Sequence, residues 1–184
     1  MDPAPTLTAG PVTLRELSLA DVDDMTLACR DADIARWTTV PSPYETEHAL
    51  AFIERRIGSV VDDESPRWGI EVDGRWAGNI SLRPDGAGLA DVGYLVAPWA
   101  RGRGVGTLAL WLACDWGFRE GGIQVITWHA VAGNEASRRM VEKVGFRVYS
   151  EIARLRVMHR GERTDVWMAD LLPEDLVPLD AVLP

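Results

Sequence analysis

Cysteine is scarce in this chain. Its 184 residues include two cysteines, Cys29 and Cys114, each within a predicted helix and without metal-ligand spacing or a neighbouring histidine. This pattern excludes a disulfide framework and gives no metal site. No residue near either thiol would lower its pKa toward that of a nucleophile, so we expect both thiols to lie in the core.

Long apolar runs are also missing. None reaches the roughly 20 residues that a transmembrane helix requires. The first residues, Met1-Asp2-Pro3-Ala4-Pro5, lack the positive start and apolar centre of a signal peptide. Both absences favour a cytoplasmic protein without a membrane partner.

Positive charge is in short supply. The chain has 19 basic against 28 acidic residues, a formal charge of −9. Such a surface repels phosphate backbones and anionic membranes, which argues against nucleic acid as the main partner. It favours a cationic partner, such as a free amine or a basic polypeptide tail, although net acidity also serves solubility alone.

The chain has the length of one compact domain, and no internal repeat or long linker divides it. We expect a flexible tail over residues 1–11 and a single domain over residues 12–172. Residues 173–184, which contain three prolines, are expected to form a C-terminal extension.

Alternating and helical spacings predict a mixed α/β fold. The Asp73-Gly74 pair predicts a tight hairpin, because both residues tolerate a positive φ. Gly145 is expected to end the last helix. Strands are expected over residues 12–17, 68–72, 76–82, 89–97, 125–130, 147–158 and 164–171, and helices over 20–30, 46–57, 107–119 and 134–144.

Three glycines alternate with other residues between a predicted strand and helix, in Arg101-Gly102-Arg103-Gly104-Val105-Gly106. Glycines allow the backbone to approach a ligand, and a helix start offers unpaired N–H groups to an anion. A Walker A loop would need a lysine between Gly106 and Thr107. A dinucleotide-binding loop would need a glycine at position 107, which is threonine here. The loop therefore indicates another phosphate ligand, or else a turn without one.

Three segments of the chain together resemble a known family. Arg101-x-x-Gly104-x-Gly106 is similar to the pyrophosphate-binding signature of the GNAT superfamily of acetyltransferases. Residues 91–98 resemble the strand that precedes it in the family, and residues 134–146 resemble its Asn-x-x-Ser helix that ends in Gly-Phe. The order and spacing resemble the ribosomal-protein N-terminal (Rim-type) branch, over residues 12–172.

The resemblance implies an α/β domain with a central sheet, mostly antiparallel and partly parallel, flanked by helices. It implies direct transfer of an acetyl group from acetyl-CoA to a primary amine in a ternary complex, without a metal. The main-chain N–H of Val96 would bind the oxyanion. The residues implied in coenzyme binding are Leu95, Val96, Ala97, Arg101, Gly102, Arg103, Gly104, Val105, Gly106, Thr107, Asn134 and Ser137.

Catalytic roles follow from the same resemblance, with alternatives. Ser137 would hydrogen-bond the departing sulfur, or face solvent. Asn134 would face the coenzyme, cap its helix, or do both. Asp91 would act as a base through water, or form a local ion pair. Val141 stands where many family members carry a tyrosine acid, so the chain departs from the family there.

The acceptor amine is expected between the first two helices and the late hairpin, near Trp37 and Tyr44. Scattered tryptophans more often fill a core, however, and the chain has 8 of them. His48, His129 and His159 show no pairing in the sequence that suggests catalysis, so packing or surface roles are expected.

Other functions stay open at this point. The acyl group could be succinyl or another acyl chain instead of acetyl. The domain could bind acyl-CoA without catalysis, which Val141 favours, or it could be a nucleotide enzyme. The acceptor is a small-molecule amine or a polypeptide N-terminus, and assembly into a homodimer is undecided.

Overall fold

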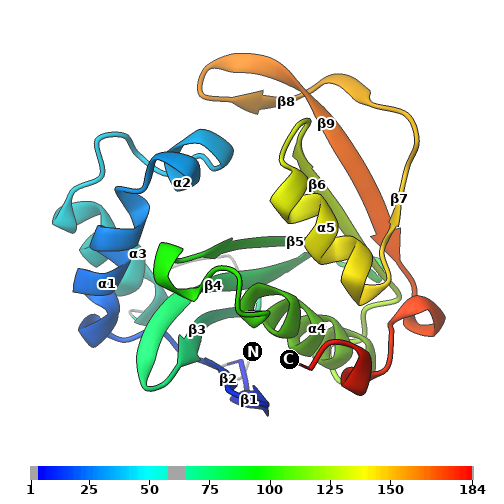
Figure 1. Ribbon diagram of the computed structural model, residues 1–184, viewed down its shortest axis with the longest axis horizontal. Helices are drawn as coiled ribbons and strands as arrows, with labels where there is room; N and C mark the ends of the chain where they lie inside the picture. The colour runs from blue at the N-terminus through cyan, green and yellow to red at the C-terminus, as the bar shows by residue number, and fades with distance from the viewer. Residues whose placement is uncertain (1–3, 58–64, 184) are drawn as a thin grey trace.

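The computed structural model describes residues 4–57 and 65–183. In these residues, nine strands form one sheet in the order β1-β2-β3-β4-β5-β6-β9-β7, with β8 paired to β9. Helices cover both faces of the sheet (Figure 1). Every neighbouring pair is antiparallel except β5 with β6, which confirms the mixed sheet that the family resemblance implies.

The strands follow the predicted alternation closely, and Asp73 and Gly74 both adopt a positive φ in the β3–β4 turn. The predicted strand over residues 147–158 is divided into two, because residues 149–152 are not in a strand. Within the second part, β8, the register against β9 also shifts between Ala153 and Val157. The strands are β1 (Leu7–Ala9), β2 (Val12–Arg15), β3 (Arg67–Val72), β4 (Arg75–Pro84), β5 (Leu89–Val96), β6 (Val125–Val131), β7 (Arg147–Val148), β8 (Ala153–His159) and β9 (Glu162–Leu171).

Within the described ranges, the α-helices are α1 (Val22–Cys29), α2 (Ala32–Trp37), α3 (Thr46–Ile57), α4 (Val105–Arg119) and α5 (Glu135–Val144). Helix α2 was not predicted; it has only 6 residues, too few to show helical spacing, and begins where the Asp31 side chain accepts from the Ile34 N–H. Residues 19–21 form a short 3-10 turn before α1. No helix in the described part of the chain is long and apolar enough to cross a membrane.

Each face of the sheet has its own core. Helices α4 and α5 cover the larger one, which contains Cys114, and α1 to α3 cover the smaller one, which contains Cys29. Both thiols are buried, as predicted. Burial raises the pKa of Cys29 to about 11, against a smaller lowering by the Tyr44 hydroxyl, so Cys29 stays protonated near neutral pH.

Both ends of the described chain pack against the domain. Leu7–Ala9 lie in the segment expected to be a flexible tail, but they pair with β2, and Trp68 Nε1 donates to the Pro5 carbonyl at 2.8 Å. At the other end, Trp111 Nε1 donates to the Val177 carbonyl at 2.7 Å. The two ends lie close together (Figure 1), so both segments contribute to the packed structure.

The feature that positions the site is the separation of β5 from β6. Their parallel pairing covers only Leu89–Asp91 opposite Val125–Thr127 in the described structure. Beyond that point β5 continues along β4 as far as Val96, while β6 continues along β9. The two strands therefore diverge and leave an opening in the middle of the sheet.

Candidate active site

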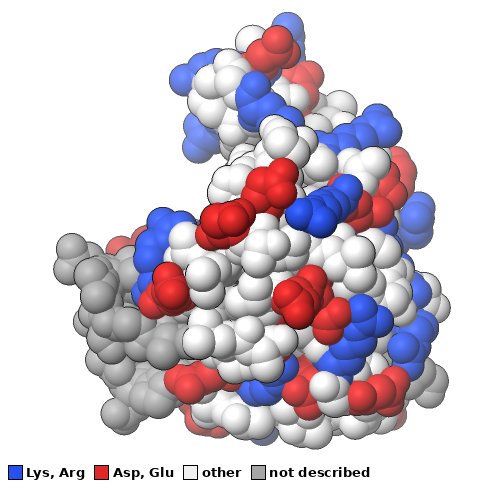
Figure 2. Space-filling view, turned by 90° about the vertical axis from the view of Figure 1, so that its left-hand side faces the viewer, with Lys and Arg blue, Asp and Glu red and all other residues white. Residues whose placement is uncertain are grey.

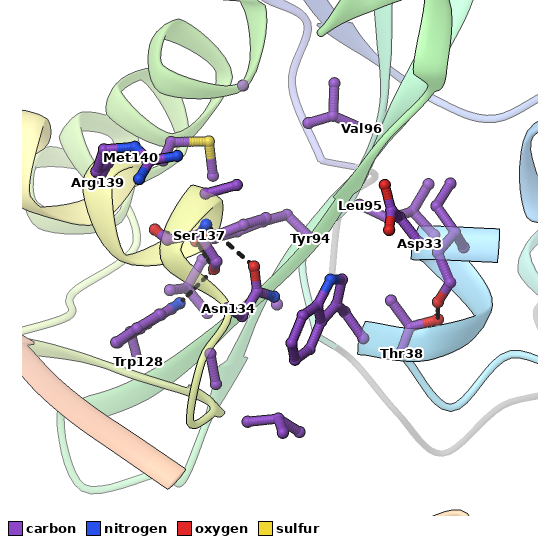
Figure 3. A pocket seen from close by; sticks show the side chains of 18 of the residues that line it. Asp33, Thr38, Tyr94, Leu95, Val96, Trp128, Asn134, Ser137, Arg139 and Met140 are labelled. Atoms are coloured by element: carbon purple, nitrogen blue, oxygen red, sulfur yellow. Dashed lines mark hydrogen bonds between the residues drawn. The ribbon is translucent and has the colours of Figure 1, made fainter. Parts of the chain in front are cut away.

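A cavity of about 680 Å³ occupies this opening. Its walls come from β5, the glycine loop, the first turns of α4 and α5, helix α2 and the end of β8 (Figure 3). Eleven of the predicted site residues line it: Trp37, Leu95, Val96, Arg101, Gly102, Gly104, Val105, Gly106, Thr107, Asn134 and Ser137. Four other predicted residues, Tyr44, Asp91, Ala97 and Arg103, are not among those that line it.

The backbone of β5 directs hydrogen-bonding groups into the opening. The Ala97 N–H donates to the Ala77 carbonyl at 2.8 Å, across toward β4. Successive residues of a strand direct their backbone groups to opposite edges, so the N–H of Val96 points away from β4, toward the side of β6. An extended ligand arm could pair with this edge as a strand would.

The glycine loop ends in the first turn of α4. Gly104 has a φ of 75° and immediately precedes the helix, which begins two residues earlier than predicted. Gly106 is needed for a different reason: a Cβ there would lie 2.6 Å from Met140 Sδ. The first N–H groups of α4 have no partner within the helix, and their residues line the cavity wall, where such groups suit an anion.

The two loop arginines are engaged by carboxylates. Arg101 Nη2 lies 2.7 Å from Asp31 Oδ1, and its Nε donates to the Val96 carbonyl. Arg103 pairs with Asp73 at 3.0 Å and borders a separate, smaller hollow. Arg101 thus ties the loop to the start of α2 instead of presenting a free charge.

Additional positive charge comes from two residues of α5 that were not predicted as site residues. Arg139 and Lys143 both line the cavity, and their spacing of four places them on one face of the helix. That spacing was visible in the sequence, and it could have identified them once the Asn-x-x-Ser helix was recognised.

At the start of α5, Asn134 and Ser137 face β5 and β6. The Asn134 Oδ1 accepts from the Ser137 N–H at 3.2 Å, so Asn134 caps the helix and lines the cavity as well (Figure 3). Ser137 Oγ lies 2.8 Å from the Tyr94 hydroxyl and accepts from Trp128 Nε1 at 3.3 Å. The serine is partly buried and held by two aromatic residues, which rules out the solvent-facing alternative.

Tyr94 and Trp128 were not predicted as site residues. Burial raises the pKa of Tyr94, and the hydrogen-bond interactions with Ser137 and Trp128 offset this only in part, so the phenol stays protonated. If Tyr94 and Trp128 both donate to Ser137 Oγ, the serine proton is free to point into the cavity. Val141, at the position of the family's tyrosine, is fully buried in the core.

Asp91 is the last residue of β5 that pairs with β6. There it forms an ion pair with Arg83 and contacts His129 Nδ1 at 3.1 Å. Partial burial opposes its charge, but the hydrogen bonds and charges of His129 and Arg83 prevail and hold its pKa below the usual range. The local ion pair considered for Asp91 is therefore present. Its role as a base stays a prediction.

The structure separates the two residues predicted to contact the acceptor. Trp37 lines the cavity from the end of α2. Tyr44 is buried in the core beneath α1 to α3, next to Cys29, and burial raises the pKa of its hydroxyl. Ala97 is likewise fully buried, because its side chain points into the same core.

The β8–β9 hairpin borders the cavity on the side where the acceptor was predicted. Val157, Met158 and His159 line it from β8. The hairpin reaches over to α2 (Figure 1), where Arg160 Nε donates to the Ala35 carbonyl at 2.6 Å and His159 Nε2 contacts the Arg36 carbonyl at 2.9 Å. These contacts join two segments that lie more than 100 residues apart in the sequence.

Solved structures share this fold over almost the whole chain. A Vibrio cholerae protein described as a ribosomal-protein-serine acetyltransferase superposes with a TM-score of 0.81 at 17% identity, over 94% of this chain and 100% of its own. Mycobacterium smegmatis RimJ, solved with a coenzyme A disulfide, gives 0.80 at 22% identity, over 96% and 90%. The microcin C7 self-immunity acetyltransferase MccE, solved with acetyl-CoA and AMP, gives 0.79 at 16%, over 89% and 93%.

At these identities the similarity shows the fold alone. Among curated proteins, no relative matches the chain. The family model for the acetyltransferase (GNAT) domain, however, matches residues 12–147, well over half of the sequence. The chain therefore belongs to the GNAT acetyltransferase domain family.

Proposed function

We propose that this protein transfers an acetyl group from acetyl-CoA to a primary amine, on a small molecule or a polypeptide N-terminus. The observation that carries the proposal is the opening between β5 and β6, with the Val96 N–H on one side and the Ser137 hydroxyl on the other. The glycine loop and the start of α4 lie at the same cavity. Similar structures hold coenzyme A or acetyl-CoA, which supports the choice of donor.

In the proposed reaction, the pyrophosphate binds the N–H groups of residues 102–107, near Arg139 and Lys143. The pantetheine arm lies along β5, and the thioester oxygen accepts from the Val96 N–H. A neutral amine attacks the carbonyl carbon, and negative charge develops on that oxygen, where a fixed donor stabilises it most. The carbon–sulfur bond then breaks, and Ser137 hydrogen-bonds the departing thiolate.

The acceptor enters between Trp37 on α2 and the β8–β9 hairpin. Figure 2 shows that acidic and basic side chains alternate over the face formed by α1 to α3, below the hairpin. The net negative charge is therefore not gathered into one patch on this face. Any selection of the acceptor by its charge would then depend on the groups that line the cavity. The sequence favours the cytoplasm as the setting for this reaction, and we include that location in the proposal.

The test is an acceptor screen that measures release of the free coenzyme A thiol. Acetyl-CoA and succinyl-CoA are offered in parallel with peptides of varied N-terminus and with small amines. We expect amine-dependent thiol release with acetyl-CoA. Tight binding of acyl-CoA without release for any amine would instead support the non-catalytic module, which the buried Val141 favours.

A further inference from the structure

His129 lies on the acceptor side of the cavity, although its sequence context gave no sign of a catalytic role. It is on β6, two residues beyond Thr127, the last residue of β6 that pairs with β5. The alternation of β6 places it on the same face as Thr127, and hence on the face of Asp91. Its side chain is 43% exposed and lines the cavity.

The contact with Asp91 fixes the imidazole. His129 Nδ1 is 3.1 Å from Asp91 Oδ1, and this carboxylate, whose pKa is lowered, can only accept a hydrogen bond near neutral pH. The proton of a neutral imidazole therefore lies on Nδ1, and Nε2 keeps its lone pair. An imidazole held in this way by a carboxylate is prepared to take up a proton at Nε2.

Arg83 fixes the carboxylate in turn. Its Nη2 binds Asp91 Oδ2, the oxygen that His129 does not use. The guanidinium lies flat against β5 at Gly93, where a Cβ would come within 2.5 Å of Arg83 Nη1. Asp91 thus has a donor on each oxygen, and it is not free to turn toward an acceptor as a base.

The reaction needs a base at this place. A primary amine arrives mostly as the ammonium ion at neutral pH, and only the neutral form attacks a thioester. Histidine has an ordinary pKa of about 6.5, which suits proton uptake at that pH. Among the other described residues that line the cavity, His159 is engaged with the Arg36 carbonyl and Asp33 lies 3.6 Å from Arg101.

We infer that His129 Nε2 is the base that takes the first proton from the acceptor ammonium, directly or through one water, with Asp91 as its positioning residue. This inference rests on the proposed function. The freed nitrogen lone pair forms the bond to the carbonyl carbon, and the carbon–sulfur pair leaves as thiolate. The nitrogen then loses its second proton to the sulfur, and His129 returns the first to solvent, so one proton is released in each turnover.

The main test compares His129→Gln with the wild-type enzyme on the best amine from the screen. We expect kcat/KM for the amine at pH 7 to fall by about 100-fold, within the range of general-base catalysis. We also expect the wild-type pH profile of kcat/KM to contain an ionisation step that the variant lacks. Titration with coenzyme A should give the same affinity for both proteins.

The matched control is His48→Gln, an exposed histidine on α3 that does not line the cavity. It should keep the wild-type profile. The charged groups around His129 are Asp91, Arg83 and, diagonally across the β6–β9 pairing, Asp170. Asp91→Asn should therefore change the profile as well, because an amide no longer fixes the imidazole proton on Nδ1.

Nitrogen NMR of His129 gives a readout independent of turnover. We expect a protonated Nδ1 and a bare Nε2 in the wild-type protein, with the preference lost in Asp91→Asn. The inference would be overturned by the opposite tautomer in the wild type, or by a His129→Gln variant with unchanged kcat/KM for the amine and an unchanged pH profile. Either result would leave the acetyltransferase proposal intact. A wild-type protein that acetylates no amine would instead remove the proposed function, and the inference with it.

Discussion

Ser137 is the residue with the most specific surroundings in the cavity. Its oxygen contacts the Tyr94 hydroxyl and the Trp128 N–H, and its helix position is fixed by Asn134. When the Tyr94 hydroxyl donates to Ser137 Oγ as Trp128 Nε1 does, the serine proton is left for a third partner. In the proposed reaction that partner is sulfur, so the site would provide a hydrogen bond where the family's usual tyrosine is replaced by Val141.

Ser137→Ala should lower kcat by roughly 10-fold and leave coenzyme affinity nearly unchanged. The fall in kcat is expected to be smaller than is usual when a general acid is removed. A thiol with a pKa of about 8.5 is a good leaving group as its thiolate and needs little proton donation. Steady-state kinetics and calorimetry with coenzyme A measure the two quantities. Trp128→Phe keeps the serine but removes one hydrogen-bond donor to it, so its kcat should fall less than that of Ser137→Ala. An equal loss of binding in Ser137→Ala would show a purely positional role.

Gly104→Trp should abolish coenzyme A binding without unfolding the protein. A Cβ at Gly104 meets no atom within 4 Å, so the side chain extends into the space beside the helix start. The positive φ adds a strain of roughly 1–2 kcal/mol. Gly122→Trp is the matched control, because Gly122 also has a positive φ and open space but lies after the far end of α4. Loss of binding in both variants would contradict the placement of the site.

Among single residues, the sequence best predicts those that belong to a local motif or contribute through their backbone. Asn134, Ser137 and Gly104 lie where their motif predicts. Tyr44 and Ala97 do not line the cavity, because the sequence does not reveal which face of a loop or strand end turns toward the core. The pairing of His129 with Asp91 joins residues 38 apart, so no local pattern reports it.

The β8–β9 hairpin is the element that separates this cavity from an open groove. It is held to α2 and the following segment by Arg160, which binds the carbonyls of Ala35 and Val40, and by His159. These are side chain to backbone contacts, so they depend on the positions of the carbonyls and not on the side chains of α2. The hairpin therefore borders the proposed acceptor side through contacts with the backbone of α2 and the segment that follows it.

Arg160→Ala should raise KM for the amine several-fold and leave coenzyme A affinity unchanged. Two hydrogen bonds from a charged group are lost, each of which typically contributes about 1.5–3 kcal/mol, less where the group is exposed, as here. Hydrogen exchange of α2 and β8 should rise in the same variant. Arg156→Ala, an exposed arginine on the same hairpin, serves as the control. Unchanged hydrogen exchange in Arg160→Ala would mean that the hydrogen bonds of Arg160 do not hold the hairpin to α2.

Elements were predicted well where a turn signal or a long periodic run marked them. The Asp73-Gly74 hairpin and the bounds of α3 agree with the structure. Helix α2 and strand β1, with 6 and 3 residues, are too short for any periodicity to identify them. Strand β1 is formed by pairing with β2, which is a tertiary effect.

At the scale of the whole molecule, one ion pair joins the glycine loop to helix α2, which border the proposed coenzyme and acceptor parts of the cavity. Asp31 caps α2 and binds Arg101 of the glycine loop, although 70 residues separate them. Partial burial opposes the charge of Asp31, but the hydrogen bonds from Arg101 and the Ile34 N–H prevail and lower its pKa. The carboxylate is thus more stable in the folded protein than in the unfolded chain.

This lowered pKa predicts the sign of a pH effect. The stabilisation by Asp31 is complete well above its unfolded pKa of about 3.9, and it is lost as the pH falls through the lower, folded pKa. Asp31→Asn should therefore have a lower Tm than wild type at pH 7, and the difference should shrink as the solution becomes acidic. Scanning calorimetry from pH 7 to pH 3 measures it. A difference independent of pH would exclude the carboxylate as the cause.

Arg101 also donates to the Val96 carbonyl, next to the amide proposed to hold the thioester oxygen. One guanidinium thus bridges the donor strand and the helix that flanks the amine. A donor whose phosphates drew Arg101 from Asp31 would alter the free energy of α2, and with it the affinity for the amine. Thermodynamic reciprocity then requires the amine to change donor affinity by an equal factor, so this bridge would couple the affinities of the two proposed substrates through one side chain.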